Sequence, residues 1–153
     1  MRSTTEAAVR ELLDRAAIHD VLLRYARGVD NRDVALVASC FVPGAVYEGT
    51  LACGTIEAAL TTLRERLARY DGTMHMIGNH LIELRGDTAT SETYAVAYHR
   101  LQEGGTPLLS TVGVRYLDDL VRHGDEWRIQ RRVVKMEWQR REALVPPSSA
   151  QRP

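Results

Sequence analysis

The sequence contains little cysteine, and its two thiols lack the spacing of a common metal or redox site. Cys40 and Cys53 stand thirteen positions apart, and no CxxC pair is present. This pattern favours neither a disulfide framework nor a zinc site. We therefore expect both cysteines to be small buried hydrophobic residues.

The chain also lacks an excess of charge of either sign. Its 20 basic and 20 acidic residues give a formal net charge of +0, and its apolar residues are dispersed. Binders of nucleic acid or anionic membranes need long-range attraction, and a membrane-spanning helix needs a run of about 18 apolar residues. The first 20 residues include four acidic ones, Glu6, Glu11, Asp14 and Asp20. Acidic residues would interrupt the apolar region of a secretory signal, and transit peptides contain few of them. We expect a cytoplasmic protein that binds neither nucleic acid nor membrane.

Several motifs that would identify an enzyme class are missing. The sequence contains no HExxH, no GxxxxGK, no GxGxxG and no GxSxG. Metalloprotease, nucleotide-binding and hydrolase functions therefore lack their usual local signatures. Any catalytic site must be assembled from residues far apart in the sequence.

The length of 153 residues with 44% hydrophobic residues fits one globular domain. We place this domain at residues 1–140 and expect 141–153, a segment with Pro146 and Pro147, to be a disordered tail beginning at about Arg140. No internal repeat is present.

Three helices are predicted in the first half of the chain. A Ser3–Glu6 capping box begins a long helix with an apolar stripe, and this helix should end near Gly28. Asp33 can cap a short second helix that ends at about residue 39. Thr55 can cap a third helix, which ends before residue 71. A short strand, 45–48, separates the second and third helices.

The second half of the chain is rich in Val, Ile, Thr, Tyr and Leu, interrupted by glycine-containing turns. We predict four long antiparallel strands joined as a meander, at 73–84, 88–102, 107–122 and 126–138. The fold class is α+β: a curved, cone-shaped antiparallel sheet whose three N-terminal helices enclose a cavity. Such a cavity suits a small hydrophobic ligand, and the uncovered sheet face suits a homodimer or homotrimer contact.

Period-two alternation assigns side chains to the two faces of these strands. In the first long strand it places His75, Ile77 and Asn79 on one face, and Met74, Met76 and His80 on the other. His75 and His80 therefore face apart unless a bulge intervenes. In the next strand Ala95, Ala97 and His99 share one face, where the two small alanines leave room for a ligand.

Asp30 follows the apolar stripe of the first helix, so its carboxylate can turn inward, toward the sheet. A carboxylate that binds one imidazole nitrogen fixes the tautomer and stabilises the imidazolium that forms when the ring takes a proton. The residues alone leave other functions open. Asp30 can instead be a helix cap, and His75 and His99 can be ordinary strand residues. Two histidines and a carboxylate can also form a facial triad that binds iron.

Four segments resemble the SnoaL-like branch of the nuclear transport factor 2-like superfamily, to which scytalone dehydratase, bile-acid 7α-dehydratase and hexachlorocyclohexane dehydrochlorinase are similar. They are 15–20 (RAAIHD), 24–33 (RYARGVDNRD), 73–79 (TMHMIGN) and 124–129 (GDEWRI), and the resemblance covers about residues 8 to 140. It implies a catalytic dyad of Asp30 and His75, with Tyr25, Tyr47 and His99 as polar helpers.

The resemblance also implies an elimination or isomerisation that needs no metal or other cofactor, on a small, largely apolar polycyclic, aromatic or steroid-like substrate. Residues expected to line the cavity are Val29, Phe41, Ile77, Leu81 and Val112. An oxyanion-stabilising residue stays unassigned, because Arg128, Arg131, Arg132 and Arg140 are equally available. The fold also hosts non-catalytic ligand-binding or dimerisation modules and dioxygenase β-subunits, so these functions are the alternatives.

Overall fold

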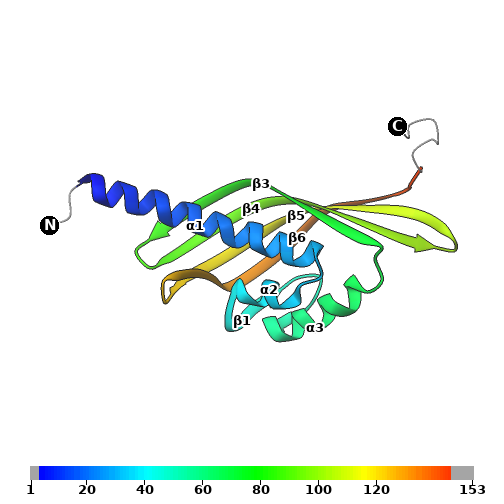
Figure 1. Ribbon diagram of the computed structural model, residues 1–153, viewed down its shortest axis with the longest axis horizontal. Helices are drawn as coiled ribbons and strands as arrows, with labels where there is room; N and C mark the ends of the chain where they lie inside the picture. The colour runs from blue at the N-terminus through cyan, green and yellow to red at the C-terminus, as the bar shows by residue number, and fades with distance from the viewer. Residues whose placement is uncertain (1–3, 146–153) are drawn as a thin grey trace.

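A long helix lies along one face of a curved six-stranded sheet in the computed structural model, which describes residues 4–145 (Figure 1). The helices are α1 (Thr4–Asp30), α2 (Val34–Ser39) and α3 (Ile56–Leu67). The strands are β1 (Phe41–Glu48), β2 (Cys53–Thr55), β3 (Gly72–Arg85), β4 (Thr88–Glu103), β5 (Thr106–His123) and β6 (Glu126–Ala143). The predicted α+β class is confirmed, and the short helices α2 and α3 gather with β1 below α1, beside the edge of the sheet that β2 and β1 form (Figure 1).

The helices begin where the predicted caps stand. Asp33 accepts a hydrogen bond from the Leu36 amide at 2.9 Å, and Thr55 is the N-cap of α3. The predicted end of the first helix near Gly28 is two residues too early, because Gly28 is not a terminating glycine. A Cβ at this position would lie 2.8 Å from a methyl group of Val37, so the glycine lets α2 pack closely on α1. Ser3, the predicted first cap, lies outside the described residues.

The sheet has the strand order β2-β1-β6-β5-β4-β3, so the predicted meander of four long strands is confirmed. The predicted start of the tail is wrong, because Arg140 to Ala143 continue β6 and pair with Thr111 to Leu108 of β5. The part of the predicted tail at 146–153 lies outside the described residues. Strand β2 was not predicted. Strand β1 pairs in parallel with β6, which attaches the N-terminal half of the chain to the sheet.

A bulge in β3 changes which side chains face α1. Ile77 pairs with Ala95 but His80 pairs with Thr93, so β3 contains one extra residue here. His75 lies before the bulge and His80 after it, and both reach the helix-covered face. The prediction that Leu81 lines the cavity is wrong, because the bulge turns it to the outer face with 63% of its surface exposed.

The core lies between α1, α3 and the concave face of the sheet. Cys40 is fully buried, as predicted. The same prediction is wrong for Cys53, which is exposed on β2, the strand at one edge of the sheet. Among residues 4–145, no helix is both long and apolar enough to cross a membrane.

Candidate active site

Asp30 and His75 meet where the last turn of α1 lies against the start of β3. The His75 Nδ1 lies 2.7 Å from Asp30 Oδ1, and the His75 amide donates to Asp30 Oδ2 at 2.8 Å. The Thr73 hydroxyl donates a third hydrogen bond to Asp30 Oδ1 at 2.9 Å. The predicted pairing of Asp30 with His75 is therefore present, and three donors hold the carboxylate in one orientation.

These hydrogen bonds determine the charge of the carboxylate. Burial on its own would raise the pKa of Asp30, but the hydrogen bonds from the side chain and main chain of His75, and from Thr73, hold this pKa below its ordinary value. The carboxylate is therefore ionised at neutral pH. It accepts the Nδ1 proton of His75 and leaves Nε2 as the proton acceptor.

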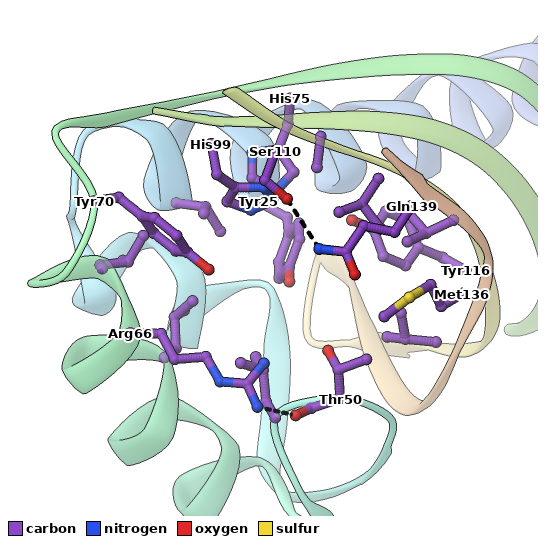
Figure 2. Close-up of a pocket in the computed structure, with 18 of the residues that line it drawn as sticks. Tyr25, Thr50, Arg66, Tyr70, His75, His99, Ser110, Tyr116, Met136 and Gln139 are labelled. Carbon is purple, nitrogen blue, oxygen red and sulfur yellow. Dashed lines mark hydrogen bonds between the residues drawn. The ribbon is translucent and has the colours of Figure 1, made fainter. Parts of the chain in front are cut away.

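His75 borders a cavity of about 170 Å³ between α1, α3 and the sheet (Figure 2). Its side chain is 8% exposed. The cavity is lined by Tyr25, Val29, Tyr47, Thr50, Leu51, Leu63, Arg66, Leu67, Tyr70, His75, Ala97, His99, Ser110, Val112, Val114, Tyr116, Val134, Met136 and Gln139. Nine of these nineteen side chains are apolar and four are tyrosines, and the remaining polar ones are Thr50, Arg66, His75, His99, Ser110 and Gln139. Such a composition suits a small ligand with few polar groups.

Most of the predicted site residues line this cavity, namely His75, Tyr25, Tyr47, His99, Val29 and Val112. Asp30 lies behind His75, as an orienting residue should. Phe41 and Ile77 were predicted to line the cavity, and this is wrong. The Phe41 ring packs edge-on against Tyr25, behind the cavity wall. Ile77 packs against the edge of the core beside the β3 bulge.

A second histidine, His99, lies beside the first. Its ring meets the His75 ring edge-on with 5.8 Å between centroids, and it packs on the Tyr70 ring at 4.7 Å. Burial lowers the pKa of His99, and the neighbouring His75 lowers it further. His99 is therefore neutral at neutral pH. Sequence reasoning missed Tyr70, because it follows α3 in a short loop with no distinguishing pattern.

Three tyrosine hydroxyls in the cavity stay protonated at any ordinary pH. Burial raises the pKa of Tyr25, Tyr47 and Tyr116. Sequence reasoning missed Tyr116, which faces Tyr25 with 5.8 Å between ring centroids. Protonated hydroxyl groups in an apolar cavity are donors for a developing oxyanion or a departing hydroxyl group.

Of the four arginines between which the sequence could not choose, Arg132 is the one placed behind the cavity wall. It is fully buried and donates to both oxygens of Asp118, at 2.8 and 2.7 Å. Its guanidinium lies 4.3 Å from the ring centroids of both Tyr25 and Tyr116. This arrangement fixes both tyrosine rings at the cavity wall. A bulge in β6, where Ile129 pairs with Leu120 but Arg131 pairs with Asp119, turns Arg132 rather than Arg131 inward.

The iron site that the sequence left open finds no support in the arrangement of ligand types. Within residues 4–145, no group of three or more His, Cys, Asp or Glu side chains is placed to hold a metal ion. The His75 and His99 rings meet edge-on, and Asp30 already binds His75.

We predict that the free energy of unfolding falls as the pH decreases from 7 toward 5. Burial lowers the pKa of both His80 and His99, with further lowering by the neighbouring His19 and His75 respectively. In the unfolded chain each histidine takes a proton at a pKa of about 6.5. The unfolded state then binds more protons, so stability present at pH 7 is lost as the pH falls through 6.5.

Urea unfolding at pH 7.5 and 5.0 measures this loss. The variants His80→Gln and His99→Gln should each show a smaller difference between the two pH values. The variant His123→Gln, at an exposed strand end, is the control and should behave like the parent protein. A pH dependence that is equal in all four proteins would contradict the prediction.

Residues 10–133 match the family model described as SnoaL-like domain. Uncharacterised proteins of Mycobacterium tuberculosis and Mycobacterium bovis are 31% identical over 131 residues, which cover 82% of this chain and 87% of each relative.

Solved structures with the same arrangement of elements include two named for elimination reactions. Hexachlorocyclohexane dehydrochlorinase LinA-type3 from Novosphingobium barchaimii has a TM-score of 0.75 at 23% identity, covering 92% of this chain and 99% of that one. A candidate scytalone dehydratase from Novosphingobium aromaticivorans has a TM-score of 0.77 at 20% identity, covering 85% of this chain and 88% of that one. At these identities the similarity establishes a shared fold.

Proposed function

The chain belongs to the SnoaL-like domain family, within the nuclear transport factor 2-like superfamily, and on this basis we propose that it is a lyase or isomerase acting by proton transfer at His75. The observation that carries the proposal is the hydrogen bond between the ionised Asp30 and His75 Nδ1 beside an apolar cavity. A carboxylate in this position holds the imidazole in one tautomer, with Nε2 free to take a proton from a bound molecule, and stabilises the imidazolium that forms.

The reaction that fits this geometry is an elimination without a cofactor. His75 Nε2 takes a proton from a carbon next to a carbonyl or another activating group. The electron pair of the broken C–H bond forms a C=C bond, while the bond from the neighbouring carbon to the leaving group breaks. A protonated tyrosine, Tyr25, gives its proton to a departing hydroxyl group, which leaves as water. The proton on His75 then replaces the one lost from Tyr25, and the site returns to its starting state.

The other polar groups have supporting roles in this proposal. Tyr47 and the neutral His99 are donors to a carbonyl oxygen on which negative charge develops. Arg132 acts indirectly, by fixing the Tyr25 and Tyr116 rings from behind the cavity wall. An isomerisation uses the same base, with the proton returned to a different carbon.

A non-catalytic binding module explains the cavity but not the dyad. Binding of an apolar molecule needs neither an ionised carboxylate nor a histidine ring oriented by one. The three donors around Asp30 serve to orient His75, which matters only when the ring moves a proton.

The proposal is tested by hydrogen exchange in deuterated water. A panel of small cyclic β-hydroxy carbonyl compounds is incubated with the protein, and NMR follows loss of the acidic C–H signal and appearance of a C=C bond. We expect exchange or elimination with the parent protein and none with His75→Gln. His123→Gln, an exposed control, should keep the parent rate. Equal rates for folded His75→Gln and the parent protein would reject His75 as the base.

A further inference from the structure

The cavity wall carries a cation but no anion. Arg66 and two histidines line the cavity, whereas the lining residues include no aspartate or glutamate. The carboxylate nearest to the site, Asp30, is engaged by His75 and Thr73. Every polar side chain that lines the cavity is therefore either positively charged or neutral. This charge distribution favours a ligand with a negative group.

The Arg66 guanidinium has unused donors that can hold such a group. One of its terminal nitrogens donates to the main-chain carbonyl of Thr50, in the loop between β1 and β2. Within residues 4–145, no carboxylate is close enough to form an ion pair with Arg66. A guanidinium has five N–H donors and binds a planar carboxylate through two of them. Figure 2 shows Arg66 on α3, across the cavity from His75.

The volume of the cavity limits the size of the apolar part. An apolar cavity of about 150 Å³ holds one benzene ring, whereas pockets for drug-sized molecules have about 300 Å³ or more. The cavity here has about 170 Å³. One six-membered ring fits within it, and a fused polycyclic skeleton does not.

We propose that the substrate is a one-ring carboxylic acid, whose ring occupies the cavity beside His75 while its carboxylate pairs with Arg66. This inference rests on the proposed function for the chemistry at His75, but the binding geometry is independent of turnover. A single negative charge matches the single arginine, whereas a phosphate dianion would bring a second charge with no partner. Arg66 thus determines specificity and the orientation of the ring, and His75 carries out the chemistry.

Isothermal titration calorimetry with matched probes tests this inference. Benzoate and benzamide have the same ring and nearly the same shape but differ in charge, and 1-naphthoate adds a second ring. We expect benzoate to bind about tenfold more tightly than benzamide, since a charge-assisted pair is stronger than a neutral one. We expect 1-naphthoate to bind more weakly than benzoate. The preference for benzoate should shrink at high salt, because Arg66 is partly open to solvent.

Variants separate this inference from the proposed function. Arg66→Gln should remove the preference for benzoate and leave benzamide binding unchanged. Arg64→Gln, on the exposed side of the same helix, is the matched control and should keep the preference. His75→Gln should still bind benzoate, so a failure of the catalytic proposal leaves this measurement intact. Equal affinity for benzoate and benzamide, tighter binding of 1-naphthoate, an unchanged preference in Arg66→Gln, or no binding of either one-ring probe would overturn the inference.

Discussion

Replacing Asp30 by Asn is expected to lower kcat by about 10²-fold to 10⁴-fold, the range that a correctly oriented general base contributes. An asparagine oxygen can still accept one of the hydrogen bonds from His75 and Thr73, so the fold should survive. The amide carries no charge, however, and cannot stabilise an imidazolium on His75. Because the substituted residue lies behind His75, away from the ligand, KM should change little.

The double variant Asp30→Asn/His75→Ala tests whether Asp30 acts through His75. If the two residues act as one unit, the double variant should be no slower than His75→Ala alone. Asp33→Asn is the matched control: it makes the same chemical change three residues away, and asparagine caps a helix as well as aspartate does. Steady-state kinetics on the substrate found by hydrogen exchange would measure these rates. Additive losses from the two single substitutions would show that Asp30 does not act through His75.

The largest loss of stability is expected from Arg132→Met, at about 3–5 kcal/mol, because the substitution leaves the Asp118 carboxylate buried without a partner. Both side chains are 0% exposed, and their two hydrogen bonds are the ones that hold the carboxylate. The rings of Tyr25 and Tyr116 would also lose the guanidinium between them. Urea unfolding followed by circular dichroism measures the change.

Two further variants show whether the buried pair is the cause. Arg132→Met/Asp118→Leu removes both charges and should recover a large part of the loss, since an apolar pair of similar volume needs no compensation. Arg131→Met, at the adjacent position of β6, is the control. Its side chain is 44% exposed and pairs with Glu48 and Asp119, so its loss should stay within about 1 kcal/mol. A loss for Arg132→Met no larger than that of Arg131→Met would contradict the prediction.

The regular elements could be predicted from local patterns, because their signals are local. The caps at Asp33 and Thr55 and the turns between the long strands follow from backbone chemistry that a few neighbouring residues settle. The meeting of Asp30 with His75 is different. It depends on the placement of α1 against β3, forty-five positions away in the sequence, and only the resemblance to a known family indicated it.

Two bulges explain why Leu81 was misplaced and why Arg132 could not be singled out. Period-two alternation assigns faces correctly as long as a strand is regular, and one extra residue reverses every later assignment. The bulge in β3 sends Leu81 outward, and the bulge in β6 sends Arg132 inward. Neither bulge could be predicted from the residue pattern around it. Gly78 is consistent with the first, because a Cβ there would lie 3.1 Å from the Tyr94 carbonyl oxygen, but glycine also occurs in regular strands.

The parallel pairing of β1 with β6 has a consequence for how the protein folds. Strand β1 has only β2 and β6 as neighbours, so it joins the large sheet through the last strand of the chain. Val134, Met136 and Gln139 of that strand also form one wall of the cavity. A ribosome releases the residues of β6 after all other elements, and contacts between distant segments form slowly. During synthesis the β1–β2 hairpin therefore has no partner strand in the large sheet, and the cavity lacks this wall, until β6 has left the ribosome.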